Sequence, residues 1–367
     1  MSSRARDGSP IYDNFDVDLV VKVLSHTAFS PFFIFFIPIF HLFQGAKITD
    51  PTIVGWGVYY VIISLFWFVK WCSLLYRNQG DILFAPPRLD WGEQIVVITG
   101  VGSSGVGELL ANTLAVQNVN VVVLDVNPIA TDNYNITYYQ CDVSKWEEVD
   151  AVSKKVIDEI GQPTILINNA GVVQGKPILD LKPEDVQQTF GVNTLAHFYT
   201  LKAFLPGMIQ NGTGHIVTMS SALGYGGVVR MSDYAASKAA LISLNETLRY
   251  ELDKLYKCPG IRTTLVVSGR IFTPLFQSIN TSSSPIFKFF IPTVPPVTVV
   301  KKVISALNDQ HSQTVMLPFY VNFMPLLQHL PSFLRDLCQW VTGADDSTAN
   351  FIKTTGRRAD EDVAEKS

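Results

Sequence analysis

Two kinds of hydrophobic pattern divide the chain. Near the N-terminus, two stretches are apolar on every side, Phe29–Phe43 and Ile53–Val69. From about Trp91 onward, short β-branched runs alternate with segments whose apolar positions recur at helical spacing. The change falls at Leu83–Asp90, where two consecutive prolines cannot continue a helix. We therefore expect a hydrophobic N-terminal quarter, a linker and one large α/β domain.

The second apolar stretch is long enough to cross a membrane. Ile53–Val69 holds 17 residues without a charge, at the lower limit of the about 20 that a spanning helix needs. Lys70 and Trp71 follow it, as is typical of a membrane–water interface. A buried helix of a soluble core would show the same pattern. The strictly apolar part of the first stretch, Pro31–Phe40, has only 10 residues, and its prolines at positions 31 and 38 disfavour an uninterrupted helix. Whether it spans or dips into the membrane stays open.

Basic residues suggest how the apolar stretches are oriented. Lys22 precedes the first stretch, Lys47 lies between the two, and Lys70 and Arg77 follow the second. Because basic residues favour the cytosolic side, a hairpin with both ends in the cytosol is expected. The organisation is then a polar tail at 1–18, membrane-associated segments at 19–82 and the linker at 83–90. The endoplasmic reticulum and the lipid droplet both suit such a hairpin.

Strands and helices are expected to alternate after the linker. Continuous apolar strands that alternate with helices predict a doubly wound, Rossmann-type parallel sheet with helices on both faces. The expected strands are Gln94–Thr99, Val119–Asp125, Thr164–Asn168, His215–Ser220 and Thr263–Val267, and the expected helices are Glu108–Gln117, Trp146–Ile160, Pro183–Met208 and Asp233–Tyr256.

A glycine-rich turn joins the first expected strand to the first expected helix. Residues Thr99–Gly107 read TGVGSSGVG. Glycine permits a tight turn and lets the backbone approach a pyrophosphate, whose negative charge the helix N-terminus attracts. A flexible Gly/Ser loop is the alternative. The expected cofactor-binding residues of this turn are Gly100, Gly102, Ser104, Gly105, Val106 and Gly107.

Asp125 ends the second expected strand, 18 residues after Gly107. At this place a carboxylate can accept hydrogen bonds from an adenosine ribose, and it would repel a 2′-phosphate. Residues 99–127 contain no Arg or Lys that could offset this repulsion. The sequence therefore favours NAD over NADP, unless Asp125 is merely an acidic turn residue before Asn127.

Tyr234 and Lys238 form a pair one turn apart on an expected helix. A nearby ammonium group, together with a positive nicotinamide, would favour the phenolate and make the tyrosine an acid or base near neutral pH. Such a pair alone is common on solvated helix faces. Here Ser221 stands 13 residues earlier, at the end of a strand, and Asn193 precedes that strand in GVNT.

These motifs and their order resemble the short-chain dehydrogenase/reductase family. The resemblance covers about Trp91–Gly343 and includes the glycine turn, CDVS around Asp142, NNAG at Asn168–Gly171, and the Asn, Ser, Tyr and Lys of a catalytic tetrad. The segment LKAFLPGMI and the tail with LPSFLRD and GADD are similar to the branch of membrane-bound retinol dehydrogenases and 17-beta-hydroxysteroid dehydrogenases.

The resemblance implies a role for each of these residues. Tyr234 would exchange a proton with the substrate oxygen, and Ser221 would hydrogen-bond that substrate oxygen. Lys238 would lower the pKa of Tyr234 and bind the nicotinamide ribose. Asn193 would hold a water of the proton relay. The remaining implied cofactor contacts are Asp142 and Val143 near the adenine, Asn169 and Gly171 in the cleft, and Ile271 and Thr273 near the nicotinamide amide.

The chain departs from the family pattern at two places. Four residues instead of three separate Gly100 from Gly105, which leaves open whether Gly100 or Gly102 makes the tight turn. Ser268 replaces a proline in the segment SGRIFT, so we expect this segment near the nicotinamide to be looser. Neither change removes a catalytic group.

The substrate is expected to be lipophilic. Residues 274–296 are rich in Ser, Phe and Pro, and the equivalent segment in the family resembles a mobile substrate lid. Together with the anchor, this lid indicates a sterol, a retinoid, or a long-chain alcohol or ketone. The alternatives are an NADPH-dependent lipid ketone reductase, and a non-enzymatic membrane or lipid-droplet scaffold.

Composition narrows the partners further. A hydrophobic fraction of 47%, a charged fraction of 16% and a net charge of −4 argue against disorder and against a nucleic-acid partner. The histidines lack metal-ligand spacing, and the four cysteines lie too far apart for a zinc motif. The family resemblance implies a homodimer or tetramer, which a membrane anchor could alter. A polar tail is expected at 344–367.

Overall fold

The computed structural model describes residues 15–78, 89–102, 105–129, 131, 133–276, 284–343 and 348. Ser104, nearly all of the expected linker, most of the two polar tails, and positions 277–283 of the expected lid lie outside these residues.

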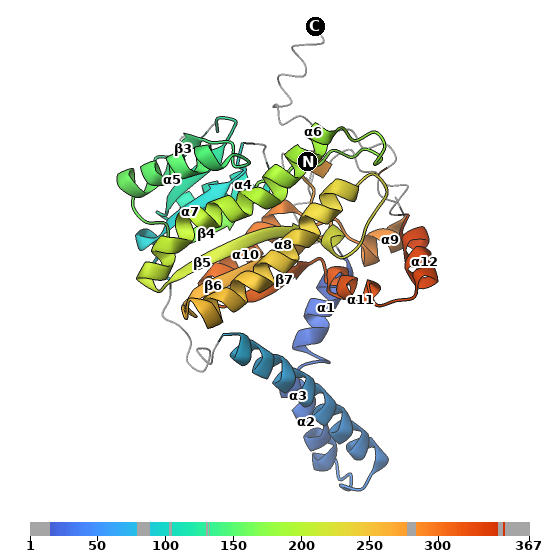
Figure 1. Cartoon of the computed structure of the whole chain (residues 1–367). Helices are drawn as coiled ribbons and strands as arrows, with labels where there is room; N and C mark the ends of the chain where they lie inside the picture. The colour runs from blue at the N-terminus through green and yellow to red at the C-terminus, as the bar shows by residue number, and fades with distance from the viewer. Residues whose placement is uncertain are drawn as a thin grey trace, which may run out of the picture.

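A parallel sheet forms the centre of the described α/β domain (Figure 1). Its strand order is β3-β2-β1-β4-β5-β6-β7, and every neighbouring pair is parallel. This order confirms the predicted doubly wound α/β fold, because the chain starts in the middle and winds to both sides. The strands are β1 Ile95–Thr99, β2 Asn120–Asp125, β3 Ile136–Gln140, β4 Ile165–Asn168, β5 Gly214–Ser221, β6 Ile261–Ser268 and β7 Gln313–Leu317.

Helices cover both faces of the sheet. On one face, α4 (Val106–Ala115) and α10 (Pro296–Asp309) pack with one side of the strands in a single buried cluster. On the other face, α5 (Trp146–Glu159), α7 (Ala196–Asn211) and α8 (Ser232–Tyr250) build the second cluster. The five expected strands are confirmed to within two residues at each end. The edge strands β3 and β7 were missed, because their residues are mostly only partly buried and lack a continuous apolar run.

The two longest expected helices are not continuous α-helices. The segment expected at 183–208 consists of α6 (Pro183–Phe190), a π-helical turn at Gly191–Leu195 and α7. The segment expected at 233–256 consists of α8 and a second π-helical turn at Glu251–Leu255. A π turn adds a residue to the helical repeat and shifts the face that the following residues present.

The N-terminal quarter forms a helical hairpin that projects from the domain (Figure 1). It contains α1 (Val17–His26), α2 (Pro31–Phe43) and α3 (Pro51–Arg77). By length and composition α3 could cross a membrane, and α1 with α2 could form a second span that is bent by 55°. Most of α3 is exposed, with only Ile53 and Ile63 buried, so it is not the core helix that the sequence left open.

The expectation that the prolines at 31 and 38 interrupt a helix in the first apolar stretch is wrong. α2 runs through Pro38 without a break, and the bend lies before Pro31, which occupies the first turn of the helix. Proline is well tolerated there because the first backbone N–H groups of a helix have no intrahelical acceptor. Two side chains of α3 hydrogen-bond the bend between α1 and α2. The Tyr59 hydroxyl donates to the Ala28 carbonyl at 2.8 Å, and the Trp67 indole donates to the Phe29 carbonyl at 2.8 Å.

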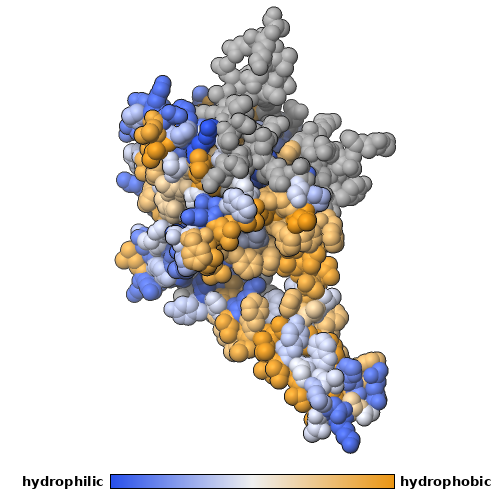
Figure 2. Space-filling view, turned by 90° about the vertical axis from the view of Figure 1, so that its right-hand side faces the viewer, coloured by the Kyte–Doolittle hydropathy of each residue, from blue (hydrophilic) through white to orange (hydrophobic). Residues whose placement is uncertain are grey.

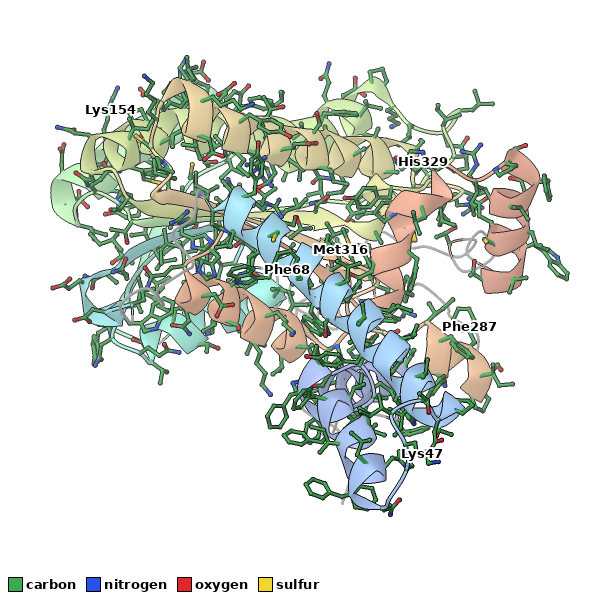
Figure 3. All side chains as sticks on the ribbon, turned by 90° about the horizontal axis from the view of Figure 1, so that it is seen from below. Lys47, Phe68, Lys154, Phe287, Met316 and His329 are labelled. Carbon is green, nitrogen blue, oxygen red and sulfur yellow. The ribbon has the colours of Figure 1, made fainter. Side chains whose placement is uncertain are left out.

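The hairpin is attached to the α/β domain at both of its ends. At the end of α3, the fully buried Asn78 accepts a hydrogen bond from the Ser312 backbone at 2.7 Å, and Arg77 donates to Thr314 at 3.2 Å. At the start of α1, Asp18 accepts from the Phe319 backbone at 2.6 Å. Seen from below, α3 runs from the tip near Lys47 back beneath the domain (Figure 3).

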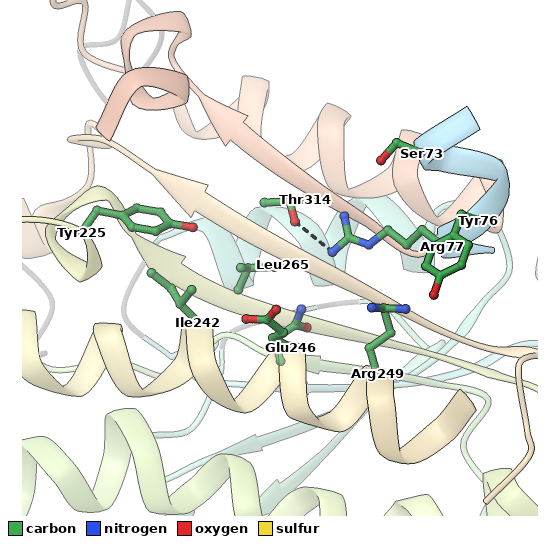
Figure 4. Close-up of a pocket in the computed structure, with 10 residues that line it drawn as sticks. Ser73, Tyr76, Arg77, Tyr225, Ile242, Glu246, Arg249, Leu265 and Thr314 are labelled. Atoms are coloured by element: carbon green, nitrogen blue, oxygen red, sulfur yellow. Dashed lines mark hydrogen bonds between the residues drawn. The ribbon is translucent and has the colours of Figure 1, made fainter. Parts of the chain in front are cut away.

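A cavity of about 310 Å³ lies at this junction, between the end of α3 and the strands and helix beside it. Figure 4 shows the Arg77 and Arg249 side chains reaching it from α3 and α8, with Glu246 on the same helix as Arg249. None of the predicted catalytic residues lines it. The cavity therefore belongs to the attachment of the hairpin rather than to the candidate site.

Candidate active site

The predicted site residues gather where the central strands end. Thr99 ends β1, Asn168 ends β4 and Ser221 ends β5. Because these strands are parallel, their carboxyl ends meet at one edge of the sheet. Motifs that lie more than 100 residues apart in the sequence therefore become neighbours there.

The glycine turn after β1 is tightly packed, and Gly100 makes its sharp bend. Gly100 has φ +73°, and a Cβ atom at this position would lie 2.4 Å from the Cα of Ala170. Gly102 does not have a left-handed backbone, so the alternative left open by the extra residue is decided in favour of Gly100. Asn169 fixes the bend by donating to the carbonyls of Thr99 and Gly100 at 3.1 and 2.7 Å.

The start of α4 offers a place for a phosphate group. Gly105 caps the helix, and a Cβ there would meet no atom within 4 Å. A Cβ at Gly107 would lie 2.4 Å from the Gly100 carbonyl oxygen, so this residue must be glycine for the helix to approach the turn. Val106 points into the core. An open backbone at a helix N-terminus fits the pyrophosphate of a dinucleotide.

Asp125 lies at the end of β2 beside the glycine turn. Its carboxylate accepts hydrogen bonds from the Gly102 backbone at 2.9 Å and from the Asn127 backbone at 2.9 Å. The hydrogen bond from Asn127 is the one expected of an acidic turn residue. The hydrogen bond from Gly102 links Asp125 to the glycine turn that would hold the cofactor. A carboxylate has about four acceptor positions, so two such bonds leave room for ribose hydroxyls.

Asp142 and Val143 are held by local structure. Asp142 accepts from the backbone and the hydroxyl of Ser144 at 3.0 and 2.6 Å. Burial raises the pKa of Asp142, but these hydrogen bonds and the nearby Lys145 outweigh burial and hold this pKa below its usual value. Val143 is buried in the core. Asp142 thus stabilises the turn before α5, whether or not it also meets an adenine ring.

Ser221, Tyr234 and Lys238 come together from β5 and α8. The side chains of Ser221 and Tyr234 share a hydrogen bond, and the Ser221 hydroxyl also accepts from the Leu223 backbone at 3.2 Å. The Lys238 ammonium donates to the Met219 carbonyl at 2.9 Å and lies 5.7 Å from the centre of the Tyr234 ring. All three side chains are buried.

Asn193 joins this group from the π-helical turn. Its amide donates to the Val172 carbonyl and to the Ser237 hydroxyl, both at 3.0 Å, and accepts from the Val172 backbone at 2.8 Å. A Cβ at Gly171 would lie 3.6 Å from both the Asn193 oxygen and the Lys238 nitrogen. Asn193 and Lys238 therefore face the same small space next to Gly171.

Burial controls the ionisation of the two central residues. It raises the pKa of Tyr234 to about 12, although the hydrogen bond with Ser221 lowers it. It lowers the pKa of Lys238 to about 8. In the protein by itself, desolvation of the phenolate therefore outweighs the nearby lysine, and the combined effect of the lysine and a bound nicotinamide stays a prediction.

Apolar side chains cover Tyr234. The Phe276 ring packs edge-on against the Tyr234 ring with centroids 6.0 Å apart. Val173 and Met231 complete the buried cluster around it. This cover excludes water from the phenol and suits an apolar substrate.

The predicted segment near the nicotinamide is only partly directed toward the site. Ile271 pairs with Val294 and packs into the core below the sheet, and its carbonyl accepts from the Thr273 backbone at 2.9 Å. Ile271 therefore offers its backbone rather than its side chain. The short 3₁₀ turn Pro274–Phe276 follows and carries the ring that covers Tyr234.

Two residues of the site were missed at the sequence level. Ser237 donates to the Tyr234 carbonyl at 2.7 Å and accepts from Asn193, so it connects two members of the tetrad. Its position directly before Lys238 in YAASK was the available signal. Phe276 had no distinguishing signal, because several phenylalanines follow it in the same apolar segment. Within the described residues, no group of three or more His, Cys, Asp or Glu side chains could hold a metal ion.

Comparison with known proteins places these features in a family. The family model for the short chain dehydrogenase matches residues 94–284. "Epidermal retinol dehydrogenase 2" of Mus musculus is 37% identical over 259 residues, which cover 68% of this chain and 81% of the mouse protein. "Retinol dehydrogenase 10" of Rattus norvegicus is 32% identical over 321 residues, covering 77% and 92%. The chain belongs to the short-chain dehydrogenase family.

Within this family, the chain falls in the retinol dehydrogenase branch. Among solved structures, "4-hydroxyisoleucine dehydrogenase complexed with NADH" has the same fold, with a TM-score of 0.54 and 24% identity, over 61% of this chain and 96% of that one. The chain is thus a nicotinamide-dependent alcohol dehydrogenase or reductase.

Proposed function

We propose that this short-chain dehydrogenase is anchored in a membrane and transfers a hydride between NAD and a lipophilic alcohol or ketone. The observation that carries the proposal is the convergence of Ser221, Tyr234, Lys238 and Asn193 beneath an apolar cover at the edge of the sheet. The glycine turn that fits a dinucleotide lies at the same edge.

Tyr234 would move the proton of the reaction. Its hydroxyl shares a hydrogen bond with Ser221, so both groups can contact one substrate oxygen. In alcohol oxidation Tyr234 accepts the hydroxyl proton, and in carbonyl reduction it donates a proton to the oxygen. Ser221 stabilises the negative charge that develops on that oxygen. Bound nicotinamide supplies the hydride acceptor or donor at the substrate carbon.

Lys238 and Asn193 would connect Tyr234 to solvent. Both face the space next to Gly171, where a water could receive hydrogen bonds from the Lys238 ammonium and donate one to the Asn193 oxygen. Ser237 holds the Asn193 amide in place. A proton taken up by Tyr234 can leave along this path without opening the apolar cover.

The carboxylate of Asp125 supports NAD as the cofactor. It lies beside the glycine turn, where a ribose 2′-phosphate would be repelled and ribose hydroxyls would be accepted. Asp142, Val143, Asn169, Gly171, Ile271 and Thr273 are the further residues that we propose line the cofactor site, Val143, Ile271 and Thr273 through their backbone.

A lipophilic substrate and a membrane location are supported together. The relatives named retinol dehydrogenase suggest a retinoid, a sterol or another long-chain lipid. The exposed apolar hairpin would anchor the enzyme to the endoplasmic reticulum or the lipid droplet with the catalytic domain in the cytosol. Substrates dissolved in the lipid would then be concentrated near the enzyme.

Reduction is the second candidate direction. With a pKa of about 12, Tyr234 carries its proton at neutral pH in the protein alone, which is the form that donates to a carbonyl. This observation favours a ketone or aldehyde reductase if NADPH is the preferred cofactor.

Cofactor selectivity is the first test. The detergent-purified chain should bind NADH more tightly than NADPH, and Asp125→Asn should lose that preference. The asparagine amide keeps one acceptor oxygen, so it can retain one of the two hydrogen bonds from the Gly102 and Asn127 backbone. Asp142→Asn is a matched control, which should weaken both cofactors equally or neither. A preference of the wild type for NADPH would overturn the assignment of NAD.

Turnover is the second test. Tyr234→Phe should retain cofactor binding and thermal stability but lose oxidation and reduction of lipid alcohols and ketones. If a folded wild-type chain binds neither cofactor, the non-enzymatic scaffold becomes the better explanation.

A further inference from the structure

Among the residues that the structure describes, no other element covers the apolar face of helix α12 (Ser332–Thr342). Phe333, Leu337, Trp340 and Val341 are all exposed, with exposed fractions of 67% for Phe333 and 80% for Trp340. Their spacing of i, i+4, i+7 and i+8 puts them on one side of the helix. We call these four residues the α12 face.

The α12 face lies on the side of the domain that also carries the anchor. Ile286 and Phe290 of the neighbouring α9 (Pro285–Phe290) are exposed as well. On α9, the Phe289 ring lies 5.5 Å from the ring of Phe15, just before α1. Figure 2, which views this side, shows hydrophobic residues extending from the hairpin onto the domain. The apolar surface of the anchor therefore continues toward α9 and α12.

α12 is attached to the loop that connects two catalytic residues. The Gln339 side chain donates to the Gly227 carbonyl at 2.7 Å. Gly227 lies between Ser221 and Tyr234 in the sequence, in the loop that leads from the end of β5 to α8. The position of α12 is thus linked to the position of the site.

We propose that α12 lies in the interface of the same bilayer that holds the hairpin, and that this second contact keeps the substrate side of the domain against the lipid. With 11 residues α12 is about 16 Å long, too short to span a bilayer, but an amphipathic helix of this kind can lie in the headgroup region. Tryptophan is enriched at that level. The inference rests on the proposed membrane anchor.

The lipid surface is the occupant that the surroundings favour. The α12 face lies near α9, whose Phe289 ring packs against Phe15 at the base of the apolar hairpin, so one planar bilayer would cover the hairpin and this side of the domain together (Figure 1). A second copy of the chain would have to cover α12 while leaving the adjoining hairpin free for lipid. A substrate that enters beside α12 would pass from the membrane to Tyr234 without crossing water.

Site-specific fluorophores test the contact directly. The full chain, with Cys72, Cys258 and Cys338 changed to Ser and the buried Cys141 kept, receives one cysteine for an environment-sensitive fluorophore. The probe is reconstituted in phosphatidylcholine vesicles with nitroxide-labelled acyl chains, with iodide added as the aqueous quencher. The three labelled variants are Leu337→Cys on the α12 face, Arg335→Cys on the polar side of α12, and Val61→Cys on the hairpin.

The expected result is quenching by the lipid nitroxide at positions 337 and 61, and quenching by iodide at 335. If position 61 is quenched by lipid and 337 by iodide, the anchor stands and the α12 contact is wrong. If position 61 is quenched by iodide, the proposed anchor is wrong, and the α12 proposal, which rests on that anchor, is overturned with it. A lipid-independent change at 337 that grows with protein concentration would show self-association and would also overturn the proposal.

Kinetics test the consequence for the substrate. The double change Leu337→Ser with Trp340→Ser should raise KM for a long-chain alcohol in vesicles by about tenfold. It should leave turnover of a short, water-soluble alcohol unchanged, because neither side chain touches the tetrad. Arg335→Ser is the matched control and should change neither. An unchanged KM for the long-chain alcohol would contradict delivery from the lipid.

Discussion

Gly105 and Gly107 lie two residues apart in the proposed cofactor turn, yet alanine should lower stability at Gly107 only, although it should weaken cofactor binding at both. At Gly107 a Cβ would lie 2.4 Å from the Gly100 carbonyl oxygen and 2.5 Å from the Asn169 amide nitrogen. At Gly105 a Cβ would meet nothing within 4 Å, and the backbone has φ −115°, which alanine adopts easily. Gly107→Ala therefore perturbs the packing of the fold, whereas Gly105→Ala only fills the space proposed for the pyrophosphate.

The structure gives the size of the effect at Gly107. An ordinary contact begins at 3.4 Å, so the turn or the Asn169 side chain must move by about 1 Å. Overpacking of this kind costs about 1–3 kcal/mol. Loss of the two Asn169 hydrogen bonds adds about 1 kcal/mol each, and the better helix propensity of alanine returns about 1 kcal/mol. We therefore expect Gly107→Ala to lose about 2–4 kcal/mol of stability, which lowers Tm by about 5–12 °C.

The assay measures Tm and NADH affinity for both variants. Gly107→Ala should lose stability and binding together. Gly105→Ala should stay within about 1 kcal/mol of the wild-type stability but bind NADH at least about tenfold more weakly, which corresponds to about 1.4 kcal/mol. Wild-type affinity in Gly105→Ala would refute the proposed path of the cofactor. A wild-type Tm in Gly107→Ala would refute the packing argument.

Three further predictions follow from burial. Phe276→Ala should admit water to Tyr234 and lower its pKa from about 12, so the pH–rate profile of alcohol oxidation should move to lower pH; Phe276→Leu should leave the profile nearly in place, and an unmoved profile in the alanine variant would contradict the role of the cover. Asn78→Ala should cost about 2–4 kcal/mol in denaturant unfolding, because a buried backbone N–H and carbonyl at the start of β7 lose their partner; normal stability would show that the anchor is not fastened there. Burial lowers the pKa of His197 and His215 from 6.5 to about 3. Between pH 6.5 and pH 3 only the unfolded chain gains these protons, so the free energy of unfolding should be at its full value above pH 6.5 and fall toward pH 3. At pH 5 the loss should be about 2 kcal/mol for each histidine. His215→Gln should remove about half of that loss, and an equal loss in the wild type and the variant would contradict this prediction.

Much of the fold was readable from the sequence because its central strands are buried on both faces. The residues of β1, β2 and β4 are mostly apolar, whereas β5 and β6 mix apolar residues with buried Thr and Ser, so each strand still contains a short β-branched or apolar run. The edge strands β3 and β7 lack that signal, because one side of an edge strand has no neighbouring strand to exclude water. Their existence depends on pairing with β2 and β6, which is a tertiary interaction.

The residue types of the candidate site could also be predicted, but their environment could not. The spacing of Tyr234 and Lys238 follows from the helical repeat, and their order after Ser221 is visible in the chain. In the protein by itself the pKa of Tyr234 is raised by burial, and Phe276, which comes from another segment, packs against the Tyr234 ring and contributes to that burial. Local spacing carries no information about desolvation.

By itself the sequence determined the fold class, and it predicted the apolar N-terminal segments, the glycine turn and the four residues of the candidate tetrad, because each depends on residue type and short-range spacing. Only the tertiary structure decided that Gly100 makes the bend and that Ser237 and Phe276 belong to the site. It also decided that Asn78 fastens the hairpin to the residue before β7, and that α9 packs against the start of the hairpin through Phe289 and Phe15. These features arise from contacts between segments up to about 300 residues apart, and such contacts are fixed by how the whole chain packs.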